Sequence, residues 1–114
     1  MHAGVLPGVP IAEQAARTLL YLRTVDDGGQ PSDLRDGGEL WGAGYTGPPH
    51  VVFGHNAEHR PQLHPWATGI DTGCVYGGAL TALVLPGGEP VPEPRRRTEA
   101  LVQVRARQAY YPID

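Results

Sequence analysis

Three kinds of residue or segment are scarce in this sequence, and each scarcity excludes a class of protein. The chain has no lysine, and its net charge is −3, so it lacks the basic stripe of a nucleic-acid-binding protein. Its single cysteine, Cys74, excludes an internal disulfide framework. No apolar run approaches the ~20 residues of a transmembrane helix, and no charged-then-apolar signal segment begins the chain. We therefore expect a cytoplasmic protein that binds neither nucleic acid nor membrane.

Glycine and proline, by contrast, are abundant, with 16 and 12 copies in 114 residues. This content borders on that of low-complexity chains, but the apolar residues gather in runs of strand length, which indicates a folded chain. A chain of this length forms at most one domain and can bury roughly two-thirds of its surface. The composition therefore predicts a loop-rich structure with many turns and short strands.

The first third of the chain predicts one helix followed by a loop. In segment 10–25, Pro10 suits a first helical turn. The polar segment 26–39, rich in glycine and aspartate, predicts a surface loop, which is either simply mobile or a lid over a site. Trp41 and Tyr45 follow, and packing in the core is their favoured role, with base stacking as the alternative. The predicted helix carries an apolar stripe at helical spacing, made of Ile11, Ala15, Leu19 and Leu22.

The stretch 49–85 contains three apolar runs that predict strands, the first two of them buried. The run 51–53 ends at Gly54 and His55, the run at Ile70 ends at Asp71, and the third run covers 80–85. Strands hold a side chain rigidly at their ends, while the following loops give access to it. His55 and Asp71 are therefore candidate site residues.

Two other polar clusters have a simpler interpretation. The remaining nearby histidines would need a helix to share a zinc ion with His55, and Gly54 and Pro61 favour a loop there instead. The cluster 95–97 contains three arginines after a proline-rich linker, which predicts a solvated loop rather than a phosphate or partner patch. The alternating run from Leu101 predicts an edge strand. The histidines in question are His50, His59 and His64.

Four short motifs follow one another in a recognisable order. They are His2-Ala3-Gly4, Gly54-His55, Ile70-Asp71-Thr72-Gly73 and the GG-x-LTAL run that ends at Leu83. In this order they resemble the C-terminal half of calcineurin-like metallophosphoesterases. The bacterial branch is most similar: serine/threonine phosphoprotein phosphatases, bis(nucleosyl) tetraphosphatases and the phosphatase domain of polynucleotide kinase-phosphatases.

The resemblance implies a fold and a division of the chain. The implied fold is α/β (α+β): the C-terminal half of a β-sandwich flanked by helices, with one N-terminal helix and about four to six strands. Residues 1–88 would form the C-terminal part of the phosphoesterase domain. Residues 89–114 would form a linker, an edge strand and a tail.

The resemblance also implies roles for individual residues. His2 and His55 correspond to metal-binding histidines, although His2 also fits an ordinary N-terminal residue. Asn56 stands where the family usually has threonine. Asp71 would orient a ligating imidazole or an arginine, or else form a turn with its own backbone. Arg23 would hold the substrate phosphate with its planar fork, or is a plain cation at a helix end.

The intact family site holds two divalent metal ions, manganese above all, with iron, zinc, nickel or magnesium as options. These metals activate a water for attack on phosphorus. The family's first-half motifs, D-x-H, G-D-x-x-D-R-G and G-N-H-E, are absent from this sequence, so the site in this chain is incomplete.

Two hypotheses follow from this incomplete site. The chain is a fragment of a phosphoesterase that acts on a phosphoprotein, a nucleoside polyphosphate or a small phosphomonoester, and its partner is the missing N-terminal half. Alternatively, it is a non-catalytic remnant or interaction domain that pairs with another chain. In both cases we expect the 114 residues alone to be inactive.

Overall fold

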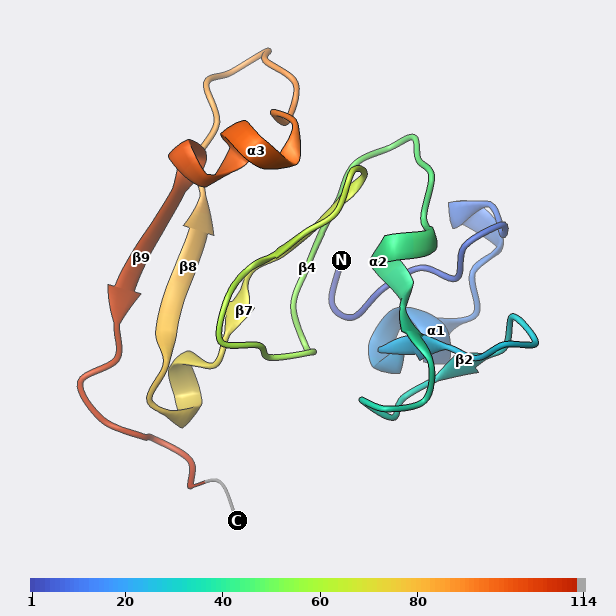
Figure 1. Cartoon of the computed structure of the whole chain (residues 1–114), viewed down its shortest axis with the longest axis horizontal. Helices are drawn as coiled ribbons and strands as arrows, with labels where there is room; N and C mark the ends of the chain where they lie inside the picture. Colours follow the sequence, from blue (N-terminus) through green and yellow to red (C-terminus); the bar gives the residue numbers. More distant parts are fainter. Residues whose placement is uncertain (113–114) are drawn as a thin grey trace.

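The computed structural model describes residues 1–112 and combines short helices with short strands (Figure 1). The helices are η1 (Ile11–Glu13), α1 (Ala16–Tyr21), α2 (Trp41–Gly44), η2 (Cys74–Tyr76), α3 (Pro94–Arg97) and η3 (Thr98–Ala100). The strands are β1 (Thr24–Val25), β2 (Pro31–Ser32), β3 (Glu39–Leu40), β4 (Val51–Phe53), β5 (Gln62–Leu63), β6 (Ala67–Gly69), β7 (Asp71–Thr72), β8 (Ala79–Leu83) and β9 (Leu101–Arg105). The predicted mixed α/β class is confirmed. The strands exceed the four to six expected, because several contain only two residues.

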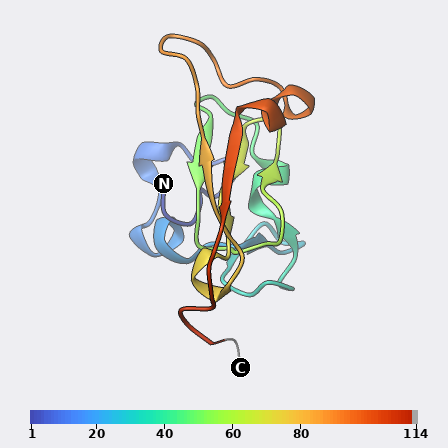
Figure 2. The same ribbon diagram turned by 90° about the vertical axis from the view of Figure 1, so that its left-hand side faces the viewer.

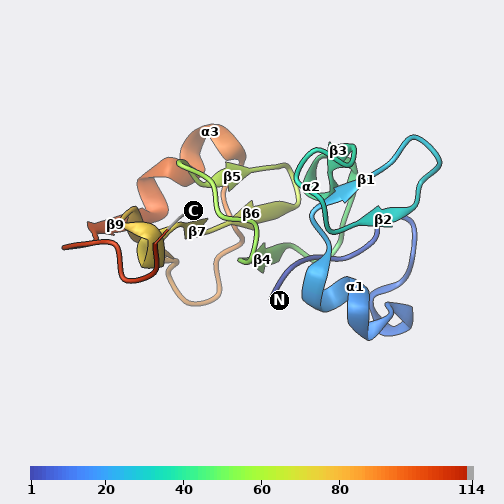
Figure 3. The same ribbon diagram turned by 90° about the horizontal axis from the view of Figure 1, so that it is seen from below.

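The strands form three small sheets. Their orders are β2-β1-β3, β4-β6-β5 and β7-β8-β9, and the one parallel pair among them is β4 with β6. Seen from below, the β4-β6-β5 sheet lies between the β1–β3 region with α1 on one side and β9 on the other (Figure 3). Every helix within residues 1–112 is too short or too polar to span a membrane.

The N-terminal segment is built into the core beside β4. Its backbone exchanges hydrogen bonds with that strand, since the Met1 amine donates to the Val52 carbonyl and the Gly54 amide donates to the His2 carbonyl. Trp41 is almost fully buried, as predicted, and its indole nitrogen donates to the Ala3 carbonyl. The core cluster around it comprises Val5, Leu22, Trp41, Val51, Phe53 and Ala67.

The predicted helix over residues 10–25 is wrong in its length. The chain forms a single 3-10 turn, η1, then extends through Gln14 and Ala15 before α1 begins. Gln14 explains the break, because its side-chain amide bonds the Leu6 amide and the carbonyls of Leu6 and Val9. A side chain that satisfies nearby backbone groups competes with helical hydrogen bonding.

The predicted loop over residues 26–39 also contains more structure than expected. The strand β1 pairs with both β2 and β3, so this segment forms a small antiparallel meander. Asp26 makes the first turn, because its carboxylate accepts hydrogen bonds from the amides of Gly28 and Gln30. The polar residues of this segment correctly indicated a turn. Strands of two residues, however, are too short to show the alternation of apolar and polar residues by which a strand is predicted.

The solvated loop predicted for residues 95–97 is wrong for one arginine. Arg95 and Arg96 are exposed, but Arg97, at the end of α3, has no exposed surface. The Arg97 guanidinium donates to three backbone carbonyls, those of Pro92, His64 and Ala67. Buried polar groups persist when their hydrogen bonds are made, and here one arginine joins α3 to the turn between β5 and β6.

The hairpin of β8 and β9 turns an apolar face outward. Leu80 pairs with Val104 and Ala82 pairs with Val102, so these four side chains share one face, and Val84 continues it. Leu80 and Val104 are both 63% exposed. Figure 2 shows the two strands in front of the rest of the chain. We call this surface the hairpin face; its residues are Leu80, Ala82, Val84, Val102 and Val104.

The opposite side of the same hairpin is polar and turned inward. Thr81 is 6% exposed, and its hydroxyl pairs with that of Thr72 and accepts a hydrogen bond from the Gln103 amide. Exposed contiguous apolar patches mark surfaces of interaction. In this hairpin the apolar face is therefore exposed and the polar face is turned inward, the reverse of the usual arrangement.

Candidate metal and phosphate site

His55 lies where β4 ends, in a backbone conformation that few side chains adopt. Its φ is 70°, and such left-handed geometry costs about 1–3 kcal/mol outside glycine. The conformation turns the imidazole toward His2, and the two ring centroids are 5.0 Å apart. Because the N-terminal segment is hydrogen-bonded to β4, the structure brings together two histidines separated by 53 positions.

The surroundings of His55 favour the neutral imidazole, the form that binds metal ions. Burial lowers its pKa, and the positive charges of Arg23 and His2 lower the pKa further. The Tyr21 backbone and the Asp71 carboxylate act in the opposite direction. The net depression keeps the ring neutral near pH 7, with a lone pair free to bind a cation. The Nε2 atom of His55 is buried and finds no hydrogen-bond partner among the described residues.

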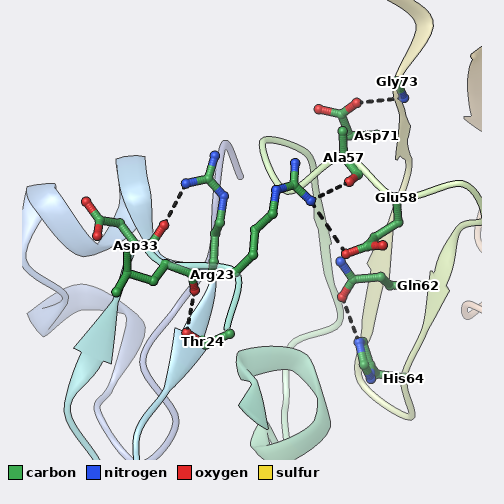
Figure 4. Close-up of polar contacts among 11 residues, drawn as sticks. Arg23, Thr24, Asp33, Ala57, Glu58, Gln62, His64, Asp71 and Gly73 are labelled. Atoms are coloured by element: carbon green, nitrogen blue, oxygen red, sulfur yellow. Dashed lines mark hydrogen bonds and ion pairs between the residues drawn. The ribbon is translucent and has the colours of Figure 1, made fainter. Parts of the chain in front are cut away.

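Asp71 lies beside the histidine pair and also shapes its own turn. A Cβ atom built at Gly54 would sit 3.8 Å from the Asp71 Cβ, in ordinary van der Waals contact, so Asp71 lies against the residue that precedes His55. One carboxylate oxygen accepts the Gly73 amide at 3.1 Å (Figure 4). The turn-forming interpretation is therefore observed. The carboxylate still acts on the histidine pair, since its charge raises the pKa of His55.

Arg23 is oriented by the β1–β2 meander. One terminal nitrogen donates to the Asp33 carbonyl at 2.7 Å, and the Nε atom is buried without a partner in residues 1–112 (Figure 4). The guanidinium is close enough to depress the pKa of His55. The four predicted residues, His2, His55, Asp71 and Arg23, thus lie around one region at the end of β4.

The histidine pair fits part of a metal site. Within residues 1–112 no three histidine, cysteine, aspartate or glutamate side chains are grouped to hold one ion. A catalytic metal needs at least three protein ligands, and a binuclear centre needs more. The unpartnered Nε2 of His55 suits one coordination position and His2 a second. These residues do not fit a complete binuclear centre by themselves.

Two of the other histidines, His50 and His64, have hydrogen-bond partners within the chain. His50 pairs with the Thr68 hydroxyl at 2.8 Å, and His64 pairs with the Gln62 amide oxygen at 3.0 Å (Figure 4). Burial and the charge of Arg97 lower the pKa of both rings. Both rings thus contribute hydrogen bonds within and beside the β4-β6-β5 sheet.

Two further polar residues, Arg35 and Asn56, lie near the site, and neither was assigned a role from the sequence. Arg35 donates to the Ala57 carbonyl at 2.8 Å and lies 3.7 Å from the Glu58 carboxylate, which ties the meander to the loop after His55. Asn56 is 3% exposed, and its side-chain oxygen is buried without a partner in the described chain. Asn56 had a sequence signal, since it replaces threonine in the motif, but Arg35 had none.

Comparison with known proteins identifies relatives among phosphate-ester hydrolases. A bis(5'-nucleosyl)-tetraphosphatase PrpE [asymmetrical] of Halalkalibacterium halodurans is 47% identical over 57 residues, which cover 50% of this chain and 23% of that protein. The protein of the same name from Bacillus subtilis is 41% identical over 54 residues, covering 47% and 22%. No family model matches the chain.

A solved structure extends the similarity to almost the whole chain. It is described as the "crystal structure of a putative diadenosine tetraphosphatase", with a TM-score of 0.71 and 33% identity, and covers 92% of this chain and 45% of its own. The predicted resemblance to calcineurin-like metallophosphoesterases is therefore confirmed. Within that class, the matched proteins carry the name of bacterial nucleosyl tetraphosphatases. The chain spans about a quarter of the curated relatives' length and less than half of the solved one.

Proposed function

We propose that this chain is the C-terminal part of a binuclear-metal phosphoesterase that hydrolyses nucleoside polyphosphates. His2 and His55 would each supply an imidazole to the metal centre, Arg23 would bind a substrate phosphate, and Asp71 would position the histidines. The observation that carries the proposal is the His2–His55 pair at the end of β4, with the buried, unpartnered Nε2 of His55. The names of the relatives favour nucleoside polyphosphates over phosphoproteins and small phosphomonoesters.

Divalent metals, manganese above all, would supply the hydroxide and neutralise phosphate charge when bound. The remaining ligands would come from a polypeptide equivalent to the part of the solved tetraphosphatase that this chain does not match. Without those ligands the 114 residues would be inactive.

The hairpin face supports the need for a further polypeptide. Leu80 belongs both to this face and to the lining of the cavity that contains His2 and His55. A partner that covers the hairpin face would therefore also border the histidine pair. The same observation favours the second candidate function, a non-catalytic domain that pairs with another chain, and activity separates the two.

The test is Mn²⁺-dependent hydrolysis of diadenosine tetraphosphate by the 114-residue chain alone and mixed with the N-terminal part of a PrpE relative. We expect hydrolysis only in the mixture, and a loss of at least about 100-fold in His55→Ala. His50→Gln is the control, because glutamine can keep the bond to Thr68 outside the site. Hydrolysis by the 114-residue chain alone would refute the proposal that its metal site is incomplete. Hydrolysis by a mixture that contains His55→Ala would refute the role of His55 as a metal ligand. A folded but inactive mixture would favour the non-catalytic domain.

A further inference from the structure

A second cavity, of about 550 Å³, lies next to the histidine pair and takes no part in the roles assigned above. It is enclosed by η2, by the loop after His55 and by the C-terminal segment at Tyr111. Its volume is in the range of small-molecule sites. Thr72 lines both this cavity and the one that contains His2 and His55, so the two cavities are neighbours.

Two tyrosines form the aromatic side of this cavity. The ring centroids of Tyr76 and Tyr111 are 6.3 Å apart, and the rings meet edge to face. An edge-to-face pair leaves a ring face uncovered by its partner, and the residues Tyr76 and Tyr111 are 41% and 64% exposed. A planar ligand can therefore stack on one tyrosine while its edge contacts the other.

Backbone hydrogen bonds hold both tyrosines in place. The Tyr76 amide donates to the Gly73 carbonyl, and the Tyr111 amide donates to the Val75 carbonyl at 2.9 Å. Gly73 and Gly77 flank η2 with φ values of 71° and 93°, a conformation that glycine adopts without strain. The C-terminal segment thus returns to η2 and adds a ring to the cavity.

The cavity also has a charged side. Arg35 and Glu58 line it, and the hydrogen bond from Arg35 to the Ala57 carbonyl holds the guanidinium there. A carboxylate accepts hydrogen bonds from an exocyclic amine, and an arginine attracts phosphate. Aromatic rings beside such groups form the usual platform for a nucleobase.

We propose that this cavity, which we call the tyrosine cavity, binds the adenine base of a nucleoside polyphosphate. The inference rests on the proposed function and adds the site of the base. With the base on Tyr76 or Tyr111, the phosphate chain would extend from the tyrosine cavity toward His55 and His2, because the buried Thr72 lines both cavities and makes them neighbours. The structure therefore assigns substrate selection to η2 and the C-terminal segment, while the histidine pair serves the phosphates.

The test measures adenosine binding to the full 114-residue chain, without metal, by isothermal titration calorimetry and saturation-transfer NMR. Adenosine carries no phosphate, so its binding depends on the tyrosine cavity alone. We expect Tyr76→Ala and Tyr111→Ala each to weaken binding between about 5-fold and about 150-fold, the usual effect of one stacked base. Tyr76→Phe keeps the aromatic ring and should retain binding, which separates stacking from misfolding.

Tyr110→Ala is the matched control, because Tyr110 is 57% exposed and adjacent in sequence but does not line the tyrosine cavity. Adenosine binding that is absent, or unchanged in Tyr76→Ala and Tyr111→Ala, would overturn the inference. Ribose 5-phosphate that binds as tightly as adenosine would overturn it as well. None of these results bears on the His55-dependent hydrolysis of the mixture, so the inference and the proposed function can fail separately.

Discussion

The β4-β6-β5 sheet and the β8–β9 hairpin differ in which side chains they bury: the sheet buries apolar side chains, and the hairpin buries polar ones. In the first region, Val51 and Phe53 are buried, and the His50 and His64 rings each have a partner. In the second region, Leu80 and Val104 face solvent while the Thr81 hydroxyl is buried. The β4-β6-β5 sheet buries its apolar side chains and pairs its polar ones. The β8–β9 hairpin leaves apolar side chains exposed to solvent. The difference locates the part of the chain where a partner would be needed.

The largest effect should come from removing the buried arginine of the first region. Arg97→Met removes the arginine donor from the carbonyls of His64 and Pro92, while the Ala67 carbonyl keeps the His64 amide, and each buried unsatisfied group costs about 1–3 kcal/mol. We expect the free energy of unfolding to fall by at least about 2 kcal/mol in urea denaturation. Arg96→Met, in the exposed neighbour, should change it by less than about 0.5 kcal/mol. Equal effects in the two variants would contradict the structural role of Arg97.

A moderate effect should appear as a pH dependence of the free energy of unfolding, caused by His50 and His64 in the same region. Burial and the charge of Arg97 hold the pKa of His50 and His64 below 6.5 in the folded chain. The unfolded chain then binds more protons below pH 6.5, so stability is fully present above that pH and falls as the pH drops through it.

Urea denaturation at pH 7.5, 6.5 and 5.5 measures how steeply the free energy of unfolding changes with pH. The double variant His50→Gln/His64→Gln should flatten it, because glutamine keeps a polar group at each position and does not titrate there. A slope as steep in the double variant as in the parent would assign the pH dependence to other groups.

The smallest effect on stability should come from the hairpin face. Val102→Thr together with Val104→Thr keeps β-branched side chains in β9, so the free energy of unfolding should change by less than about 0.5 kcal/mol. The same pair should weaken association with the N-terminal part of a PrpE relative, measured by sedimentation velocity.

Thr81→Val, on the inward face, is the contrasting variant. It removes a hydroxyl bonded to Thr72 and Gln103 and should lower stability without weakening association. A stability loss in the β9 variant larger than that in Thr81→Val would reverse the comparison between the two faces.

Much of the candidate site was readable from short motifs. Val51 to Phe53 forms a strand because β-branched and aromatic residues are bounded by proline and glycine, and His55 follows it as predicted. The packing of Trp41 and the strand from Leu101 were likewise predictable. The helix over residues 10–25 was misjudged, because Gln14 bonds backbone groups that lie five to eight residues before it.

Other features depend on contacts that no local pattern records. The burial of Arg97 requires carbonyls from the turn between β5 and β6, some 30 positions away. The tyrosine cavity requires Tyr111 to return to η2, where Tyr76 lies 35 positions earlier. Sequence periodicity reports which residues are apolar within one element, but it does not report which distant carbonyl or ring will meet them.

The sequence by itself determined the strand beginning at Val51, the glycine that precedes His55, and the relationship to phosphoesterases, because these depend on local residue types and their order. Only the tertiary structure decided that His2 meets His55, and that the hairpin of β8 and β9 turns its apolar face outward. The physical reason is that strand pairing fixes side-chain direction by register, and register is set between segments far apart in the chain.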